Sequence, residues 1–146
     1  MPRLCDARGW RRLSAVEWLL VGEAVLFLAL ARLVVAAVSF RHVAGWLCHM
    51  PETATCDESR VLAVRAAIAR AAIRVPWDAR CLPQALAAKA MLAHRGCGSS
   101  LHLGARFDAA AQMKAHAWLV AGGTIVVGRV GMQGITPVAH FGARST

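Results

Sequence analysis

The stretch that decides the fold runs from residue 75 to residue 86 and reads VPWDARCLPQAL. Pro76 forces a turn, because proline lacks the N–H group that a helix interior needs. Pro83 is tolerated in a helix only within the first turn, where its missing N–H costs nothing. A helix is therefore expected to begin close to Cys81. Gly96 is a typical residue just past a helix end and should close it.

Cys81 is the candidate nucleophile. At the start of a helix, the dipole and the unpaired backbone N–H groups stabilise a thiolate. The thiolate is the form of cysteine that attacks carbonyl carbons. The same N–H groups can stabilise the negative oxygen that such an attack creates. The alternative interpretation is that Cys81 is a small buried residue at a helix start, with no chemical role.

The residues after Gly96 follow the alternating pattern of strands. Apolar side chains recur at every second position from Leu101 to Phe107, and Gly122-Gly123 is a hairpin signal between two apolar segments. The second half of the chain therefore predicts a cysteine-bearing helix followed by a small antiparallel sheet. The expected strands are residues 101–107, 116–121, 124–128 and 135–141.

His116 is the candidate base. A thiol needs a group that takes its proton and later protonates the leaving amine, and an imidazole on a sheet facing a helix start can do both. His102, one strand earlier, is a rival for this role. We prefer His116 because it begins a predicted strand and neighbours Trp118. The alternative is a strand histidine that bonds only to the backbone.

The first half of the chain predicts an apolar helical scaffold. Residues 15–38 are long and apolar enough to span a bilayer. However, Glu23 and Arg32 fall inside this segment, and a charge near the centre of a spanning helix costs about 2.5–3.5 kcal/mol. Ser14 and Glu17 have the spacing of a capping box, which is typical of a water-exposed helix start. One or two core helices are therefore expected, with a membrane-surface helix as the alternative.

A second helix is expected over residues 57–75. Apolar residues recur there at steps of three and four, which places them on one stripe. Arg65 and Arg70 fall off that stripe, towards water, and Pro76 should end the helix. The stripe consists of Val61, Val64, Ile68, Ala71 and Val75.

Composition narrows the function classes. The formal charge is +9, but the arginines are dispersed and no aromatic-and-basic platform recurs, which argues against nucleic-acid binding. The cysteine count is five, an odd number without a regular framework, which argues against a disulfide scaffold. A reducing cytoplasm is the simplest location. Cys48, His49 and Cys56 match no closed zinc pattern, so no metal site is predicted and buried thiols near a loop are expected.

Four segments together carry a resemblance to a known family. They are Cys81-Leu82 at the start of an alanine-rich helix, residues 90–96 at its end, Leu101-His102-Leu103-Gly104, and above all Ala115-His116-Ala117-Trp118-Leu119. In combination they resemble the lasso-peptide B2 proteins, which are transglutaminase-like cysteine peptidases of bacterial lasso-peptide maturation. Residues 76–141 carry these motifs.

The resemblance implies a fold and a role. The fold would be α+β, with a papain/transglutaminase-like core over residues 76–146 preceded by an N-terminal helical region over residues 1–75. Cys81 would be the nucleophile and His116 the base of a hydrolase, a leader peptidase acting on a ribosomally made precursor peptide (a RiPP). A separate leader-recognition protein and an ATP-dependent lasso cyclase, which closes the macrolactam, would be partners. The chain itself would need no cofactor. The alternative is a non-catalytic scaffold of the maturation complex.

One position departs from the family pattern. The family's third catalytic residue is an Asp near residues 127–129, and this chain has no Asp or Glu after Asp108. The group that orients His116 would then be a side chain of Asp78, Asp108 or Gln133, a backbone carbonyl, or nothing. Loss of the orienting group usually lowers the rate without erasing the chemistry. Trp77 and Trp118 are candidates for lining the acyl site.

Overall fold

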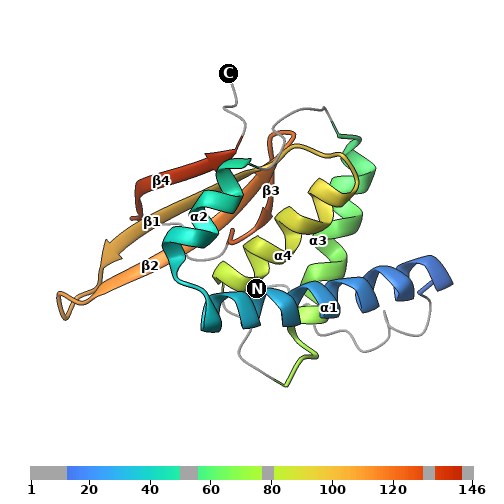
Figure 1. Ribbon diagram of the computed structural model, residues 1–146, viewed down its shortest axis with the longest axis horizontal. Coiled ribbons are helices and arrows are strands. Elements are labelled where there is room, and N and C mark those ends of the chain that lie inside the picture. The colour runs from blue at the N-terminus through green and yellow to red at the C-terminus, as the bar shows by residue number, and fades with distance from the viewer. Residues whose placement is uncertain (1–12, 50–55, 77–80, 130–133, 143–146) are drawn as a thin grey trace.

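The computed structural model describes residues 13–49, 56–76, 81–129 and 134–142. These residues form an α+β fold, as the sequence predicted (Figure 1). The elements in chain order are α1 (Ala15–Ala37), α2 (Phe40–His49), α3 (Glu58–Ala72), α4 (Cys81–His94), β1 (Ser100–Phe107), β2 (Met113–Ala121), β3 (Thr124–Val127) and β4 (Thr136–Gly142).

The sheet is antiparallel and has the strand order β3-β2-β1-β4. β1 and β2 form a long hairpin, in which Gly104 lies opposite His116. β3 returns along the other edge of β2 after the predicted turn at Gly122-Gly123, where both glycines have positive φ. β4 then pairs with the far edge of β1, so consecutive strands β3 and β4 lie on opposite edges of the sheet.

The helices gather on one side of this sheet (Figure 1). α4 packs on β1, β2 and β3, while α3 packs on β3 and α2 on β4. α1 packs on α3 and α4 and adds a further layer. One continuous core joins these layers, and its largest fully buried side chains are Leu28, Ile68, Met91, Leu92, Leu101, Leu119, Val61 and Val64. The packing therefore holds the start of α4 against β2.

α1 begins with the predicted capping box. The Ser14 hydroxyl accepts a hydrogen bond from the Glu17 N–H at 3.3 Å, and the Glu17 carboxylate accepts one from the Ser14 N–H at 2.8 Å. Only one face of the helix is buried, through Val21, Ala24, Leu28 and Ala31. The opposite face exposes Leu19, Leu26, Leu30 and Leu33 to solvent. By length and hydropathy this is the one described helix that could cross a membrane.

An ion pair fixes α1 to the end of α4. The Arg95 guanidinium donates to both carboxylate oxygens of Glu23, at 2.8 and 2.6 Å. Both side chains are about three-quarters buried, with exposed fractions of 22% and 26%. The charge of Glu23 is therefore matched inside the fold, which accounts for a glutamate within so apolar a segment.

α3 follows its predicted stripe only in part. Val61, Val64, Ile68 and Ala71 are buried, but the helix ends at Ala72, four residues before Pro76. Arg70 lies 3.8 Å from the carboxylate of Glu17. Arg65 lies off the stripe, as predicted; it is partly buried and lines a cavity beside α3.

A disulfide joins Cys56 to Cys97, with 4.9 Å between their Cα atoms. The prediction of an unpaired Cys56 thiol is therefore wrong. Sequence spacing offered no indication of this pair, because the two cysteines are 41 positions apart and the helices α3 and α4 bring them together. The bridge ties the start of α3 to the residues after α4. Cys48 and His49 have side chains outside the described part of the structure.

Candidate active site

Cys81 is the first residue of α4, as the sequence predicted. Pro83 occupies the third position of the helix, where its missing N–H removes no helical bond. The helix ends at His94 in a turn closed by Gly96, whose φ is +70°, and the N–H of Cys97 bonds the carbonyl of Leu92 at 2.8 Å. The Cys81 thiol is half-buried, and it is free of any disulfide.

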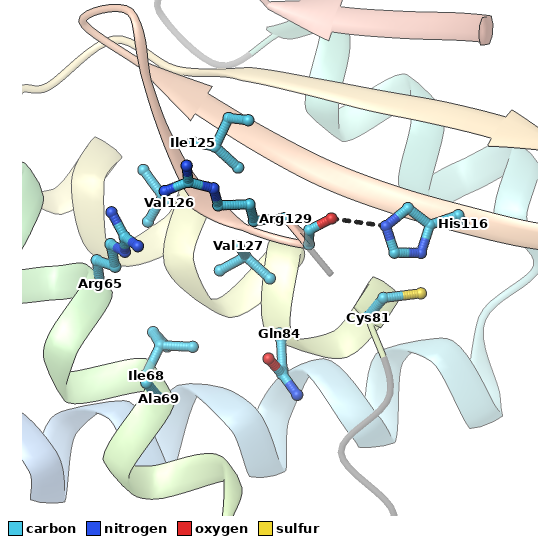
Figure 2. A pocket seen from close by; sticks show the side chains of 11 residues that line it. Arg65, Ile68, Ala69, Cys81, Gln84, His116, Ile125, Val126, Val127 and Arg129 are labelled. Carbon is cyan, nitrogen blue, oxygen red and sulfur yellow. Dashed lines mark hydrogen bonds between the residues drawn. The ribbon is translucent and has the colours of Figure 1, made fainter. Parts of the chain in front are cut away.

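His116 is brought to Cys81 by the packing of β2 on α4. It is the fourth residue of β2, because the strand begins at Met113; the prediction that His116 begins the strand is wrong on this point. The two side chains line the same cavity. Figure 2 shows the Cys81 sulfur on the side of the imidazole opposite to the nitrogen that bonds Gly128.

The His116 ring is held by the main chain. Its Nε2 atom lies 2.7 Å from the carbonyl oxygen of Gly128 (dashed in Figure 2). A carbonyl oxygen can only accept a hydrogen bond, so Nε2 carries the proton and donates it. In the neutral ring, Nδ1 is then the unprotonated nitrogen, the one able to accept a proton. The geometry thus leaves the basic nitrogen available to a thiol.

Gly128 is the residue that makes this bond possible. Its φ of +87° lies in the region that favours glycine. A Cβ atom on this residue would collide with the carbonyl oxygen of Ala117 and would lie 2.8 Å from the Cα atom of Trp118. β3 ends at Val127, and this tight turn against β2 aims the next carbonyl at His116. The family pattern that the sequence resembles has an Asp at this place, and this chain has no Asp or Glu after Asp108.

Trp118 packs between two imidazoles. Its ring stacks on His102, with centroids 5.3 Å apart and an angle of 9° between the planes, and on His116, at 6.2 Å and 22°. A Cβ atom on Gly104 would lie 3.0 Å from the Trp118 ring and would collide with Ile135, so a residue without a side chain is required there. Trp118 is buried and lies against the His116 ring, outside the set of residues that line the cavity.

The remaining candidates for the orienting group lie elsewhere. Asp108 is at the turn between β1 and β2, where its carboxylate accepts from the N–H groups of Ala110 and Gln112 at 2.9 and 3.0 Å. The hydrogen bond from the Gln112 N–H is the main cause that lowers the pKa of Asp108. Asp78, Gln133 and Trp77 fall outside the described residues. Of the alternatives left open by the sequence, the backbone carbonyl is the one found at His116.

The cavity has a volume of about 310 Å³ and extends from Cys81 and His116 between α3 and β3. Gln84 lines it from the same face of α4 as Cys81, three residues further on. Two cationic side chains also line it, Arg65 of α3 and Arg129 after β3, and no motif in the sequence marked either of them. The lining is completed by Ile68, Ala69, Ile125, Val126, Val127 and Gly128. Within the described residues, no three His, Cys, Asp or Glu side chains are grouped as metal ligands.

This arrangement has the parts needed for acyl transfer. A thiol at a helix start lies beside an imidazole whose tautomer is fixed by a third group. The first backbone N–H groups of a helix have no partner within the helix, so those at the start of α4 can stabilise an oxyanion. A family model described as the transglutaminase-like superfamily matches residues 24–140 of the chain. No curated protein and no solved structure matches it significantly. The family match covers most of the sequence, from within α1 to β4, and the chain therefore belongs to the transglutaminase-like superfamily.

Proposed function

We propose that this protein is a cysteine peptidase that removes the leader from a ribosomally made lasso-peptide precursor. The observation that carries the proposal is the placement of Cys81 and His116 on one cavity, with the Nε2 atom of His116 bonded to Gly128. The superfamily includes cysteine peptidases and transglutaminases. The resemblance of residues 115–119 to the lasso-peptide B2 proteins narrows the proposal to leader removal.

The proposed reaction begins with proton transfer. Nδ1 of His116 takes the proton of the Cys81 thiol, and the thiolate attacks the carbonyl carbon of the scissile peptide bond. Backbone N–H groups at the start of α4 stabilise the oxyanion. The imidazolium then protonates the leaving amine, and the C–N bond breaks to leave a thioester on Cys81. His116 next takes a proton from water, whose oxygen attacks the thioester and releases the leader acid and the free thiol.

The proposal also assigns partners. The new amine would be the group that an ATP-dependent lasso cyclase joins to an Asp or Glu side chain. A separate leader-recognition protein would deliver the precursor. In this scheme the chain itself uses no cofactor or metal, works in the cytoplasm and binds no nucleic acid.

The decisive experiment incubates the purified protein with a lasso-peptide precursor and a leader-recognition protein, both to be sought among the reading frames that neighbour its gene. Wild type, Cys81→Ala and His116→Gln are compared, and mass spectrometry identifies the products. We expect wild type to release the leader at one bond and each variant to lose at least about a thousandfold in rate. Circular dichroism on each variant checks that the fold persists.

The alternative is a non-catalytic scaffold, which the absence of the family's Asp suggested. It predicts that Cys81→Ala supports maturation as well as wild type, while omission of the whole chain abolishes it. Cleavage by Cys81→Ala would therefore overturn the peptidase proposal. An acyl-transfer activity through the same thioester would instead appear as leader joined to an added amine.

A further inference from the structure

Two arginines lie at one end of the candidate active-site cavity. Arg65 comes from α3 and Arg129 follows β3, and both line the cavity that Cys81 and His116 line. Figure 2 shows both guanidinium groups at the end of the cavity away from the Cys81 sulfur. The topology thus brings two cations from distant parts of the sequence to one place.

Neither guanidinium has a partner among the residues that the structure describes, in contrast to other arginines of the chain. Arg70 and Arg95 pair with Glu17 and Glu23. Among the described residues that line the cavity there is no carboxylate. Two like charges that converge without a counterion repel each other, and partial burial of Arg65 weakens its hydration. An anion between them would relieve both costs.

The shape of the cavity restricts the anion. The cavity is also lined by the aliphatic side chains of Ile68, Ile125 and Val127. A volume of about 310 Å³ accommodates a peptide side chain and excludes a folded partner. Guanidinium groups present paired N–H donors that match the two oxygens of a carboxylate. A side chain with a short aliphatic stem would contact the aliphatic lining, and its terminal carboxylate would bind the guanidinium groups.

We propose that Arg65 and Arg129 form a subsite for an Asp or Glu side chain of the peptide substrate, close to the bond that Cys81 attacks. This inference rests on the proposed function, because it assumes that a peptide acylates Cys81. It makes the two arginines specificity-determining residues, with no role in proton transfer.

The test measures alkylation of Cys81, which needs no cleavage. The probes are N-iodoacetyl-glutamic acid α-amide, whose side chain carries a carboxylate, and N-iodoacetyl-glutaminamide, its neutral isostere. Each reacts when the sulfur displaces iodide to form a thioether, and mass spectrometry of the Cys81 peptide gives the rate. The ratio of the two rates removes any change in thiol reactivity.

The variants are the double change Arg65→Gln and Arg129→Gln, and Arg32→Gln as a matched control. Arg32 is exposed on α1, away from the cavity. We expect the double variant to lower the acid-to-amide ratio about fivefold, the size of a half-exposed charge pair. The control should keep the wild-type ratio. An unchanged rate with the neutral probe shows that the site remains folded.

Equal ratios in wild type and the double variant would overturn the subsite. An equal fall of the acid-to-amide ratio in Arg32→Gln would show that the ratio depends only on net charge, which would also overturn the subsite. A third probe, N-iodoacetyl-glutamine, carries its carboxylate on the main chain; equal preference for it would overturn the assignment to a side chain. If the ratio falls as expected but no precursor is cleaved, the proposed function fails while the subsite stands.

Discussion

The imidazole of His116 and the main-chain carbonyl of Gly128 are joined by a hydrogen bond of 2.7 Å. This bond occupies the place where the resembling family has a carboxylate. A carbonyl oxygen fixes the ring tautomer as a carboxylate would, but it carries only a partial charge. It therefore stabilises the imidazolium less. We expect the same ring orientation as with a carboxylate, but a slower proton-transfer step.

Gly128→Ala should lower the rate of the proposed cleavage by roughly 10–100-fold, the usual effect of losing an orienting partner. The added Cβ atom would collide with the Ala117 carbonyl and displace the oxygen from His116. Gly123→Ala is the matched control, because Gly123 also has positive φ (+78°) but no atom within 4 Å of the added Cβ. Both variants carry the backbone penalty, so equal rates in the two variants would contradict the orienting role of Gly128.

His102→Gln should retain most of the cleavage rate, whereas His116→Gln should lose it. His102 stacks on Trp118 at 5.3 Å but does not line the cavity that contains Cys81. Its removal would loosen the packing behind His116 without removing the base. The measurement is kcat as a function of pH for each variant. Loss of activity in His102→Gln, with His116→Gln active, would reverse the assignment of the base.

The free energy of unfolding should fall in acid because of Glu23. The hydrogen bond from Arg95 lowers the pKa of Glu23, so the folded protein favours the ionised carboxylate. The resulting stabilisation is present above the ordinary glutamate pKa of about 4.3 and is lost as the pH falls through the lower folded-state value. Urea unfolding of wild type and Glu23→Gln should differ by about 1 kcal/mol at pH 7 and converge near pH 3. A constant difference across this range would rule out the linkage.

The two faces of α1 should respond differently to truncation. Leu28 is 0% exposed and packs in the core, while Leu26 is 58% exposed. Leu28→Ala should cost about 2–5 kcal/mol of unfolding free energy, because it leaves a cavity. Leu26→Ala should stay within about 0.5 kcal/mol. Chemical denaturation measures both, and equal costs would show that α1 is not packed as described.

Reduction of the Cys56–Cys97 bridge should destabilise the protein without stopping the proposed chemistry. The bridge closes a long loop, and removal of such a bridge typically costs about 2–4 kcal/mol. Cys56→Ala with Cys97→Ala should show this loss in denaturation experiments under oxidising conditions. The rate of cleavage should be retained, because Cys81 is free of the bridge. Loss of activity at a temperature where the variant remains folded would instead link the bridge to the active site.

The sequence predicted the elements of the site well where the signals were local. Pro83 and Gly96 bounded α4, and the alternation from Leu101 onwards marked the sheet. The capping box of Ser14 and Glu17 located the start of α1. These signals act over a few residues, within one turn of helix or one hairpin, and need no knowledge of the partner element.

Two features, the place of Arg65 in the cavity and the disulfide, depended on contacts between distant segments and were missed, while the orienting group was left open among several alternatives. The orienting oxygen belongs to the main chain, so no side chain in the sequence marks it. Arg65 lies off the apolar stripe of α3. A helical pattern alone does not show that this side chain lines a cavity beside β3. The partner of Cys56 could not be recognised, because Cys97 lies 41 positions further along the chain.

The order of strands in the sheet also determines which edge is unpaired before the chain is fully folded. Cys81, His116 and Gly128 all precede β4 in the chain, yet β1 keeps one edge unpaired until β4 pairs with it. A nascent chain that stopped after β3 would contain all three of these groups in a sheet open to pairing with another molecule. Pairing of β4 is therefore the step that protects this edge of the sheet from aggregation.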